Sequence, residues 1–247
     1  MAGNRAGERL MDEFTQRTSY LLGTDGVDRL SRAAVAVFGI GGVGSYAVEA
    51  LARAGIGRLV LIDPDRVTAS NRNRQLPALV STLGKSKAQI MAERVKDINP
   101  ACQVEVREEF YLPREESYLA TLHVDYVIDA IDTVTAKVGL AREAQALHIP
   151  IVAAMGLGNK LHPEQIEVAD IYATSVCRLA RVMRRELKQA GVAKLTCVYS
   201  KEKPIAPQYP EGAEQVPGSV SFVPPVGGMI LAGLVIRAIA QKEEELL

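Results

Sequence analysis

Short apolar runs alternate along most of the chain with segments of helical periodicity. The runs are rich in β-branched residues and stop at glycine, proline or acidic residues, as the buried strands of a parallel sheet do. AVAVFG ends in Gly39, for example, and RLVLID is stopped by Pro64. The strands we expect cover residues 34–39, 58–63, 102–108, 125–132 and 149–155.

Segments with apolar residues at helical spacing lie between these runs and near both ends of the chain. The helices we expect cover residues 8–33, 43–54, 85–98, 136–147, 176–190 and 226–240. Strands that alternate with helices predict an α/β fold. The expected architecture is a Rossmann-like, mostly parallel sheet with helices on both faces.

The alternation loosens after about Gly158. Residues 201–218 are polar and rich in proline, and apolar sequence resumes after them, so we expect a mobile loop in a C-terminal extension. We interpret residues 1–247 as one domain, in which 8–158 form the nucleotide-binding βαβ core and 159–247 form the extension.

Composition excludes several classes of protein. Lys plus Arg equals Asp plus Glu at 29 each, so binding to nucleic acid would require a local basic patch. The three cysteines form no C-x-x-C pair, which argues against structural zinc and fits a reducing, cytoplasmic location. The apolar stretch at 226–240 is interrupted by Arg237 and is too short for a membrane span, so we expect a buried helix.

A glycine-rich loop follows the first expected strand. Gly39, Gly41 and Gly44 form G-x-G-x-x-G between a strand and a helix, where they permit a tight turn, approach of the backbone to phosphate, and close helix packing. Asp63 ends the next strand, where a carboxylate binds ribose hydroxyls. The combination predicts a nucleotide site, with a tight helix–strand crossing as the alternative explanation for the glycines.

The residues after Asp63 favour a triphosphate over a dinucleotide. Asn71, Arg74 and Gln75 follow within SNRNRQ, and Lys87 opens a helix. Their cations would neutralise more negative charge than a pyrophosphate carries. Asp132 lies past the end of another strand, where one carboxylate together with phosphates can bind Mg²⁺. Each of these charges taken singly is also compatible with a solvated surface.

The motifs GIGGVGS, IDPD, SNRNRQ, GKSKA and DAIDT together resemble the ubiquitin-activating-like adenylating enzymes of the HesA/MoeB/ThiF type. Longer stretches, among them DAIDTVTAK, EVADIYATSVC and VYSKEKP, are similar to the tRNA threonylcarbamoyladenosine dehydratases. This narrower resemblance covers nearly the whole chain. The missing C-x-x-C pairs fit it too, because the related sulfur-carrier adenylyltransferases usually have a zinc site built from such pairs.

The resemblance implies a set of site residues. Nucleotide contacts would come from Gly39, Gly41, Gly42, Gly44, Asp63, Asp65, Asn71, Arg74, Gln75 and Lys87. Asp132 would position Mg²⁺, and Arg74, Lys87, Asp132 and Arg17 would act in catalysis. The family is homodimeric, so Arg17 would complete the site of the neighbouring subunit, and residues 159–247 would serve the substrate and the dimer.

The resemblance also implies a reaction, the ATP-dependent dehydration of threonylcarbamoyladenosine beside the tRNA anticodon. The threonyl carboxylate would attack the α-phosphate of ATP and release pyrophosphate. The carbamoyl group would then displace AMP and close a ring. ATP and Mg²⁺ are thus the expected cofactors, tRNA is the expected substrate, and a sulfur-relay protein is a further candidate partner.

Three other functions remain open at this point. The chain could adenylate the C-terminus of a ubiquitin-like sulfur carrier, serve as a non-catalytic nucleotide-binding scaffold, or be an NAD oxidoreductase. The absence of C-x-x-C pairs argues against the first of these functions. The set of Arg74, Lys87 and Asp132 argues against the second, and SNRNRQ with Lys87 argues against the third.

The expected helix at 176–190 has one basic face, formed by Arg178, Arg181, Arg185 and Lys188. This face would track tRNA phosphates, or it would simply be solvated. Cys177 lies at the start of the same helix, as either a reactive thiol or an unreactive buried one. His123, His148 and His162 lack metal-binding spacing, and we interpret them as structural or surface residues.

Overall fold

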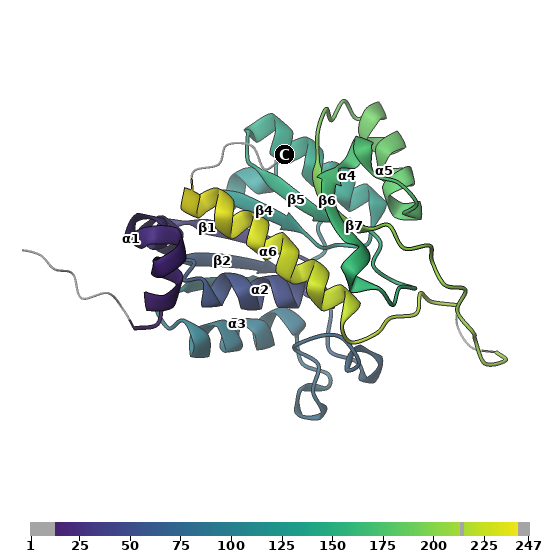
Figure 1. The fold of residues 1–247 in the computed structure, drawn as a ribbon, viewed down its shortest axis with the longest axis horizontal. Coiled ribbons are helices and arrows are strands. Elements are labelled where there is room, and N and C mark those ends of the chain that lie inside the picture. Colours follow the sequence, from purple (N-terminus) through teal and green to yellow (C-terminus); the bar gives the residue numbers. More distant parts are fainter. Residues whose placement is uncertain (1–12, 213–214, 242–247) are drawn as a thin grey trace, which may run out of the picture.

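The computed structural model describes residues 13–212 and 215–241, which form one twisted sheet between two layers of helices (Figure 1). The strands are β1 (Ala34–Phe38), β2 (Arg58–Ile62), β3 (Gln103–Arg107), β4 (Tyr126–Asp129), β5 (Ile151–Ala154), β6 (Ile166–Asp170) and β7 (Thr196–Ser200). They are ordered β3-β2-β1-β4-β5-β7-β6. All neighbouring strands are parallel except β6, which is antiparallel to β7.

The helices cover both faces of the sheet. They are α1 (Gln16–Arg32), α2 (Gly44–Arg53), α3 (Lys87–Ile98), α4 (Val134–Leu147), α5 (Arg178–Gln189) and α6 (Val223–Gln241). Alternate residues of β1 point to opposite faces. Val35 and Val37 pack with α1, α2, α3 and α6, whereas Ala36 and Phe38 pack with α4 and residues 111–124. α5 covers the sheet beyond α4, where it packs against Ala153 and Cys197.

The predicted α/β class and the mostly parallel sheet are confirmed. All five strands that the sequence predicts are present, with ends that differ by a few residues. β6 and β7 were not predicted. β6 is an edge strand whose residues are all half-buried, so no contiguous apolar run marks it. The first helix begins at Gln16 rather than residue 8, and residues 8–12 lie outside the described ranges.

α6 crosses the face of the sheet that carries α1 and α2 (Figure 1). Among the described residues it is the one helix with the length and apolarity of a membrane span, and 56% of that window is buried inside the fold. A Cβ at Gly228 would clash with the backbone oxygen of Val43, so α6 and the start of α2 are in close contact. This packing accounts for the apolar composition of α6 and agrees with the buried helix that the sequence predicts.

The proline-rich segment extends away from the body of the molecule between β7 and α6 (Figure 1). Backbone atoms of its return end make three hydrogen bonds to the rest of the fold. Asn159 N donates to Gly218 O at 2.8 Å, and Gly218 N donates to Asn159 Oδ1 at 2.6 Å. Asn73 Nδ2 donates to Ser219 O at 2.9 Å. The mobility of residues 201–218 stays a prediction.

Candidate active site

A cleft of about 1170 Å³ opens at the carboxyl ends of β1, β2, β4 and β5. Loops that follow parallel strands meet at one edge of the sheet, which is where open α/β folds bind ligands. The cleft brings together most of the nucleotide contacts predicted from the sequence. Its lining includes Gly39, Gly41, Gly42, Asp63, Asp65, Asn71, Arg74, Gln75, Lys87 and Asp132.

Three glycines shape the wall of the cleft at the start of α2. Gly39 has a φ of 84°, and a Cβ there would lie 2.7 Å from Ala130 O. A Cβ at Gly44 would overlap Gly39 O, so this glycine allows α2 to begin directly against the end of β1. A Cβ at Gly41 would meet only Gln75 Nε2, at 3.7 Å, so its backbone faces open space. Gly39 and Gly44 therefore meet steric needs, whereas Gly41 leaves room for a ligand.

Asp63 connects the glycine loop to the loop after β2. Its Oδ2 accepts a hydrogen bond from Ile40 N at 2.5 Å, and its Oδ1 accepts one from Asp65 N at 2.8 Å. The residue is 5% exposed and lines the cleft. Burial raises the pKa of the Asp63 carboxyl, although both backbone hydrogen bonds and the charge of Lys87 oppose this shift.

The cationic side of the cleft is formed by Lys87 and Arg74. Lys87 lies in the first turn of α3, is 5% exposed and pairs with Asp65 at 2.7 Å. Arg74 is half-buried and donates to Ser70 O at 3.0 Å and Asn73 Oδ1 at 2.8 Å. Asn71 Oδ1 accepts from Thr68 N at 3.2 Å, which caps the short helix at Ala69–Asn71.

Gln75 has a buried polar atom with no partner. Its Oε1 is the one buried side-chain nitrogen or oxygen atom among the described residues that makes no hydrogen bond. The side chain is 8% exposed and lines the cleft beside Gly41. Such an unpaired group is expected where a ligand supplies the missing partner.

Asp132 lies in the loop after β4, exposed within the cleft. Thr133 Oγ1 donates a long hydrogen bond to Asp132 Oδ1 at 3.4 Å. The described residues contain no group of three or more His, Cys, Asp or Glu side chains that could hold a metal. One exposed carboxylate therefore fits a cation shared with phosphates, such as Mg²⁺, and does not form a metal site alone.

A buried ion pair supports the loop that carries Asp132. Lys137 Nζ lies 2.9 Å from Asp129 Oδ2, and both side chains are at most 1% exposed. Ile131 N donates to Asp129 Oδ1 at 3.1 Å, and Lys137 Nζ donates to Ile131 O at 3.3 Å. Asp129 is thus an ion-paired acid in the interior of the fold. Burial raises the pKa of Asp129, and Lys137 opposes the shift.

The cleft also contains residues that the sequence analysis missed. Phe110 is 69% exposed and Leu112 is 53% exposed, and both line the cleft beside the buried Tyr111. Lys160, from the loop after β5, lines the cleft as well. The sequence feature that could have identified Phe110 is the pair of aromatic residues shortly after β3. The feature that could have identified Lys160 is the glycine-rich loop directly after the predicted strand at 149–155.

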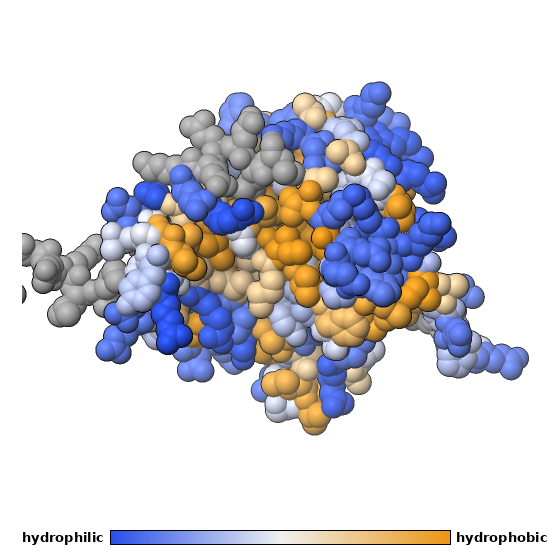
Figure 2. All heavy atoms as spheres, in the orientation of Figure 1, coloured by the Kyte–Doolittle hydropathy of each residue, from blue (hydrophilic) through white to orange (hydrophobic). Residues whose placement is uncertain are grey.

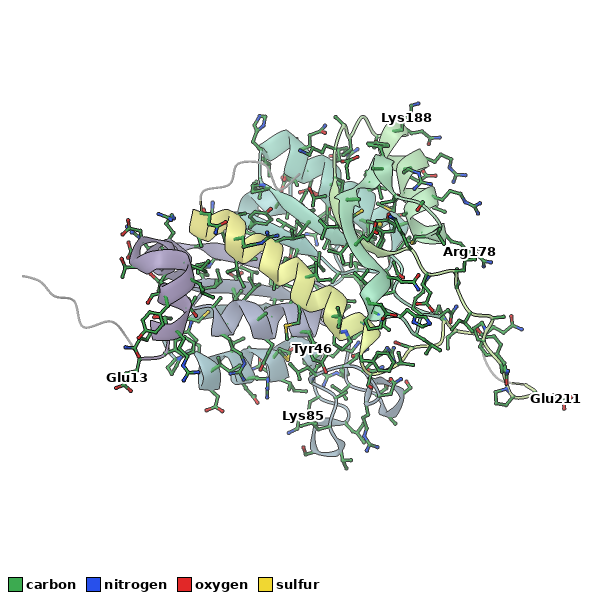
Figure 3. The ribbon with its side chains drawn as sticks, viewed as in Figure 1. Glu13, Tyr46, Lys85, Arg178, Lys188 and Glu211 are labelled. Atoms are coloured by element: carbon green, nitrogen blue, oxygen red, sulfur yellow. The ribbon has the colours of Figure 1, made fainter. Side chains whose placement is uncertain are left out.

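The four basic residues predicted on α5 are all exposed. Figure 3 labels Arg178 and Lys188, which lie at opposite ends of this helix. A second hollow of about 530 Å³ is lined by Val176, Cys177, Arg178, Arg181 and Arg184. Arg185 instead pairs with Glu186 at 2.6 Å. Arg178 and Cys177 line both hollows, so the basic end of α5 lies next to the cleft.

Cys177 is 4% exposed, and its Sγ accepts a hydrogen bond from Ala180 N at 3.5 Å as the N-cap of α5.

Two of the residues predicted for nucleotide binding or catalysis do not line the cleft. Arg17 lies on α1, exposed, and is not among the residues that line the cleft of this chain. Gly44 is enclosed beneath the glycine loop and does not line the cleft either.

Comparison with known proteins places this geometry in a family. The model of the ThiF family matches residues 15–247. The tRNA threonylcarbamoyladenosine dehydratase of Bacillus subtilis (strain 168) is 39% identical over 240 residues, which are 92% of this chain and 94% of that protein. The enzyme of that name from Escherichia coli (strain K12) is 40% identical over 210 residues, 81% of this chain and 78% of that protein.

Solved structures agree with these relatives. The E. coli dehydratase TcdA in complex with AMP superposes with a TM-score of 0.85 at 37% identity, covering 92% of this chain and 93% of that chain. The same enzyme in complex with ATP gives a TM-score of 0.83 at 36% identity, with the same coverage. The chain therefore belongs to the ThiF family, among the tRNA threonylcarbamoyladenosine dehydratases.

Proposed function

We propose that this chain catalyses the ATP-dependent dehydration of threonylcarbamoyladenosine in tRNA. The observation that carries the proposal is the cleft itself, which combines a glycine loop, a buried acid and two cations at the strand ends. Support comes from dehydratase relatives that match over nearly their whole length, one of them solved with ATP and with AMP.

In the proposed first step, the threonyl carboxylate attacks the α-phosphorus of ATP. A bond forms between a carboxylate oxygen and phosphorus, and pyrophosphate leaves with the electron pair of the broken P–O bond. An ionised carboxylate is already a nucleophile, so the protein mainly positions the reactants and stabilises charge. Arg74, Lys87 and the backbone N–H groups of the glycine loop are the groups proposed for this task.

In the second step, the neighbouring carbamoyl group attacks the acyl carbon, and AMP leaves as the ring closes. The attacking group loses one proton, and the net change in the nucleoside is the loss of water. Asp63 would bind the ribose of the nucleotide, and Asp132 would hold Mg²⁺ together with the phosphates. When bound, the cation would neutralise charge on the phosphates.

The substrate tRNA is proposed to lie along the basic face of α5. Arg178 and Arg181 are the strongest candidates for phosphate contacts, because they are exposed and line the hollow next to the cleft. Arg185 and Lys188 extend the same face farther from the cleft, and Arg185 is partly neutralised by Glu186. The chain has no net positive charge, so binding of tRNA would depend on a local basic patch of this kind.

The active form is proposed to be a homodimer in which Arg17 reaches the neighbouring cleft. Figure 2 shows apolar side chains gathered along α6 on one face of the molecule. Met229 on α6 is 45% exposed, and Tyr20 and Leu21 on α1 are 69% and 87% exposed. Exposed apolar surface of this kind is expected at an interface between subunits.

One assay tests the proposed function. The protein is incubated with Mg-ATP and one of three additions: tRNA that carries open threonylcarbamoyladenosine, a ubiquitin-like sulfur carrier, or buffer. We expect AMP and pyrophosphate only with the tRNA, together with loss of one water from its nucleoside by mass spectrometry. Turnover with the sulfur carrier instead would make the chain an adenylyltransferase of carrier proteins.

Two substitutions test the proposed site within the same assay. Asp132→Ala and Arg74→Ala should abolish tRNA-dependent AMP release and leave the circular dichroism spectrum unchanged, because both side chains contact the cleft and neither is in the core. Normal turnover by either folded variant would show that the residue has no part in the chemistry.

A further inference from the structure

The cleft continues beyond the nucleotide contacts into a second half. This half is formed by the loop after β5, the first residues of α5 and the return end of the proline-rich segment. β5 is the direct neighbour of β4 in the sheet, with Asp129 opposite Ala153. The loop after β5 therefore begins beside the loop that carries Asp132.

Lys160 supplies a buried positive charge to this second half. The residue is 4% exposed, yet it lines the cleft. Its ammonium donates to the backbone oxygen of Glu202, which uses one of its three N–H donors. Burial lowers the pKa of Lys160, and Glu202 and Cys177 oppose the shift.

Glu202 has its own partners in the backbone. Its carboxylate accepts hydrogen bonds from Leu161 N and from His162 N, each at 3.0 Å. The hydrogen bonds and ion pairs of the described residues include no ion pair between Lys160 and a carboxylate. A buried cation without an ion pair favours binding of an anion, because the anion replaces solvation that burial has removed.

The position of Lys160 is fixed by its neighbour Asn159. Asn159 has a φ of 58° and makes hydrogen bonds in both directions with Gly218. Ile205 N also donates to Asn159 O at 3.0 Å. The loop after β5 is thereby attached to both ends of the proline-rich segment, so the ammonium is held where this segment meets the cleft.

The proposed reaction gives a reason for a positive charge in the second half of the cleft. A carboxylate that attacks ATP must approach a chain of negatively charged phosphates, and the repulsion is strong in a partly desolvated cleft. Arg74 and Lys87 line the first half of the cleft, which is proposed for the phosphates. A separate positive charge is needed to hold the attacking acid.

We propose that the ammonium of Lys160 binds the threonyl carboxylate of the substrate nucleoside and holds it for attack on ATP. The proposal rests on the proposed dehydratase function. It assigns the second half of the cleft to a carboxylate-bearing nucleoside and leaves ATP to the first half. Lys160 thus distinguishes a nucleoside with a free acid from one without it.

The experiment compares wild type with Lys160→Met and with the matched control Lys203→Met. Lys203 is exposed, lies in the proline-rich segment next to Glu202, and does not line the cleft. For each protein we would measure the Kd for AMP. We would also measure Kd for three tRNAs without ATP: one with free threonylcarbamoyladenosine, one with its methyl ester, and one with unmodified adenosine.

Wild type and Lys203→Met should bind the free acid more tightly than the ester by about 10- to 100-fold, as expected for a hydrogen bond to a charged group. Lys160→Met should lose this preference, keep its affinity for AMP and for unmodified tRNA, and show a lower kcat/KM with the free acid. A Lys160→Met variant that folds and retains the preference would overturn the proposal.

The wild-type measurement stands even if Lys160→Met does not fold. Equal binding of the free acid and the ester by wild type would also overturn the assignment of Lys160. Failure of the proposed function looks different, since wild type would then release no AMP with any of the three tRNAs, whatever their affinities.

Discussion

At the scale of single residues, the ion pair of Asp129 and Lys137 connects the core to the candidate site. Two charges removed from water are costly, and an apolar pair of similar volume would often be equally stable. Here the pair also holds both backbone polar groups of Ile131, directly before Asp132. Its hydrogen bonds to the loop that carries Asp132 give a structural reason for keeping these two charges in the interior.

We predict that Lys137→Met lowers the free energy of unfolding by about 3–5 kcal/mol, because it leaves Asp129 buried without its partner. Urea unfolding followed by circular dichroism measures the change. The double substitution with Asp129→Asn should recover a large part of the loss, since the amide oxygen can still accept from Ile131 N.

A matched control comes from Arg94, a 43% exposed partner of Glu49, which keeps Arg53 as a second partner. Arg94→Met should cost only about 1 kcal/mol, because Arg94 itself is exposed to solvent and the buried Glu49 keeps Arg53 as a partner. If Lys137→Met and the double variant were equally stable, the two buried charges would not be coupled, and this account of the pair would be wrong.

At the scale of elements, the connection from β1 to α2 contains two kinds of glycine. Gly44 is needed for packing, because a methyl group there would overlap the backbone oxygen of Gly39. Gly41 borders open space in the cleft. The sequence motif predicts packing for Gly44 and approach to phosphate for Gly41, and the tertiary structure supplies the steric reason for the first and open space for the second.

Gly44→Ala is therefore expected to destabilise the protein by about 1–3 kcal/mol, as overpacking does. Gly41→Ala should leave the unfolding midpoint nearly unchanged but weaken ATP binding, measured by isothermal titration calorimetry. Gly233→Ala in α6 is the control, because nothing lies within 4 Å of its added Cβ and alanine favours a helix by up to about 1 kcal/mol. Unimpaired ATP binding by Gly41→Ala would count against a phosphate cradle at that position.

α5 carries the second prediction at this scale. The double reversal Arg181→Glu with Arg185→Glu should weaken tRNA binding. It should also reduce the slope of log K against log salt by about 0.7–0.9 for each phosphate that the helix no longer neutralises. Affinity for ATP should not change. Lys96→Glu, an exposed reversal on α3, is the comparison, and an equal effect there would mean that α5 offers no particular docking surface.

At the scale of the whole molecule, a dimer would combine residues that one chain keeps apart. Arg17 is outside the cleft of its own chain, whereas Asp132 is inside it. In a mixed dimer of Arg17→Ala and Asp132→Ala subunits, one of the two sites would have both residues intact. Each variant should be inactive alone, and an equimolar mixture after subunit exchange should recover about a quarter of wild-type turnover, from the two-fold symmetry. No recovery, with exchange verified by native mass spectrometry, would exclude the shared site.

The fold could be predicted from the sequence where one element buries a contiguous apolar face. β1, β2 and β4 are fully or almost fully buried central strands, so their apolar runs identify them. β6 is half-buried at the sheet edge and could not be found in this way. Its pairing with β7 depends on residues about 30 positions apart, which local periodicity does not record.

The candidate site divides in the same manner. Backbone requirements of the glycine loop and strand-end acids leave local sequence patterns, so the sequence alone predicted the residues that line the half of the cleft proposed for the nucleotide. It also determined the α/β class and the basic face of α5. Only the tertiary structure decided that Lys137 binds Asp129 and Ile131 O directly before Asp132, that Phe110 lines the cleft and that Lys160 is buried at its wall. These relations arise where separate loops meet at one edge of the sheet, and burial and charge environment there depend on residues far apart in the chain.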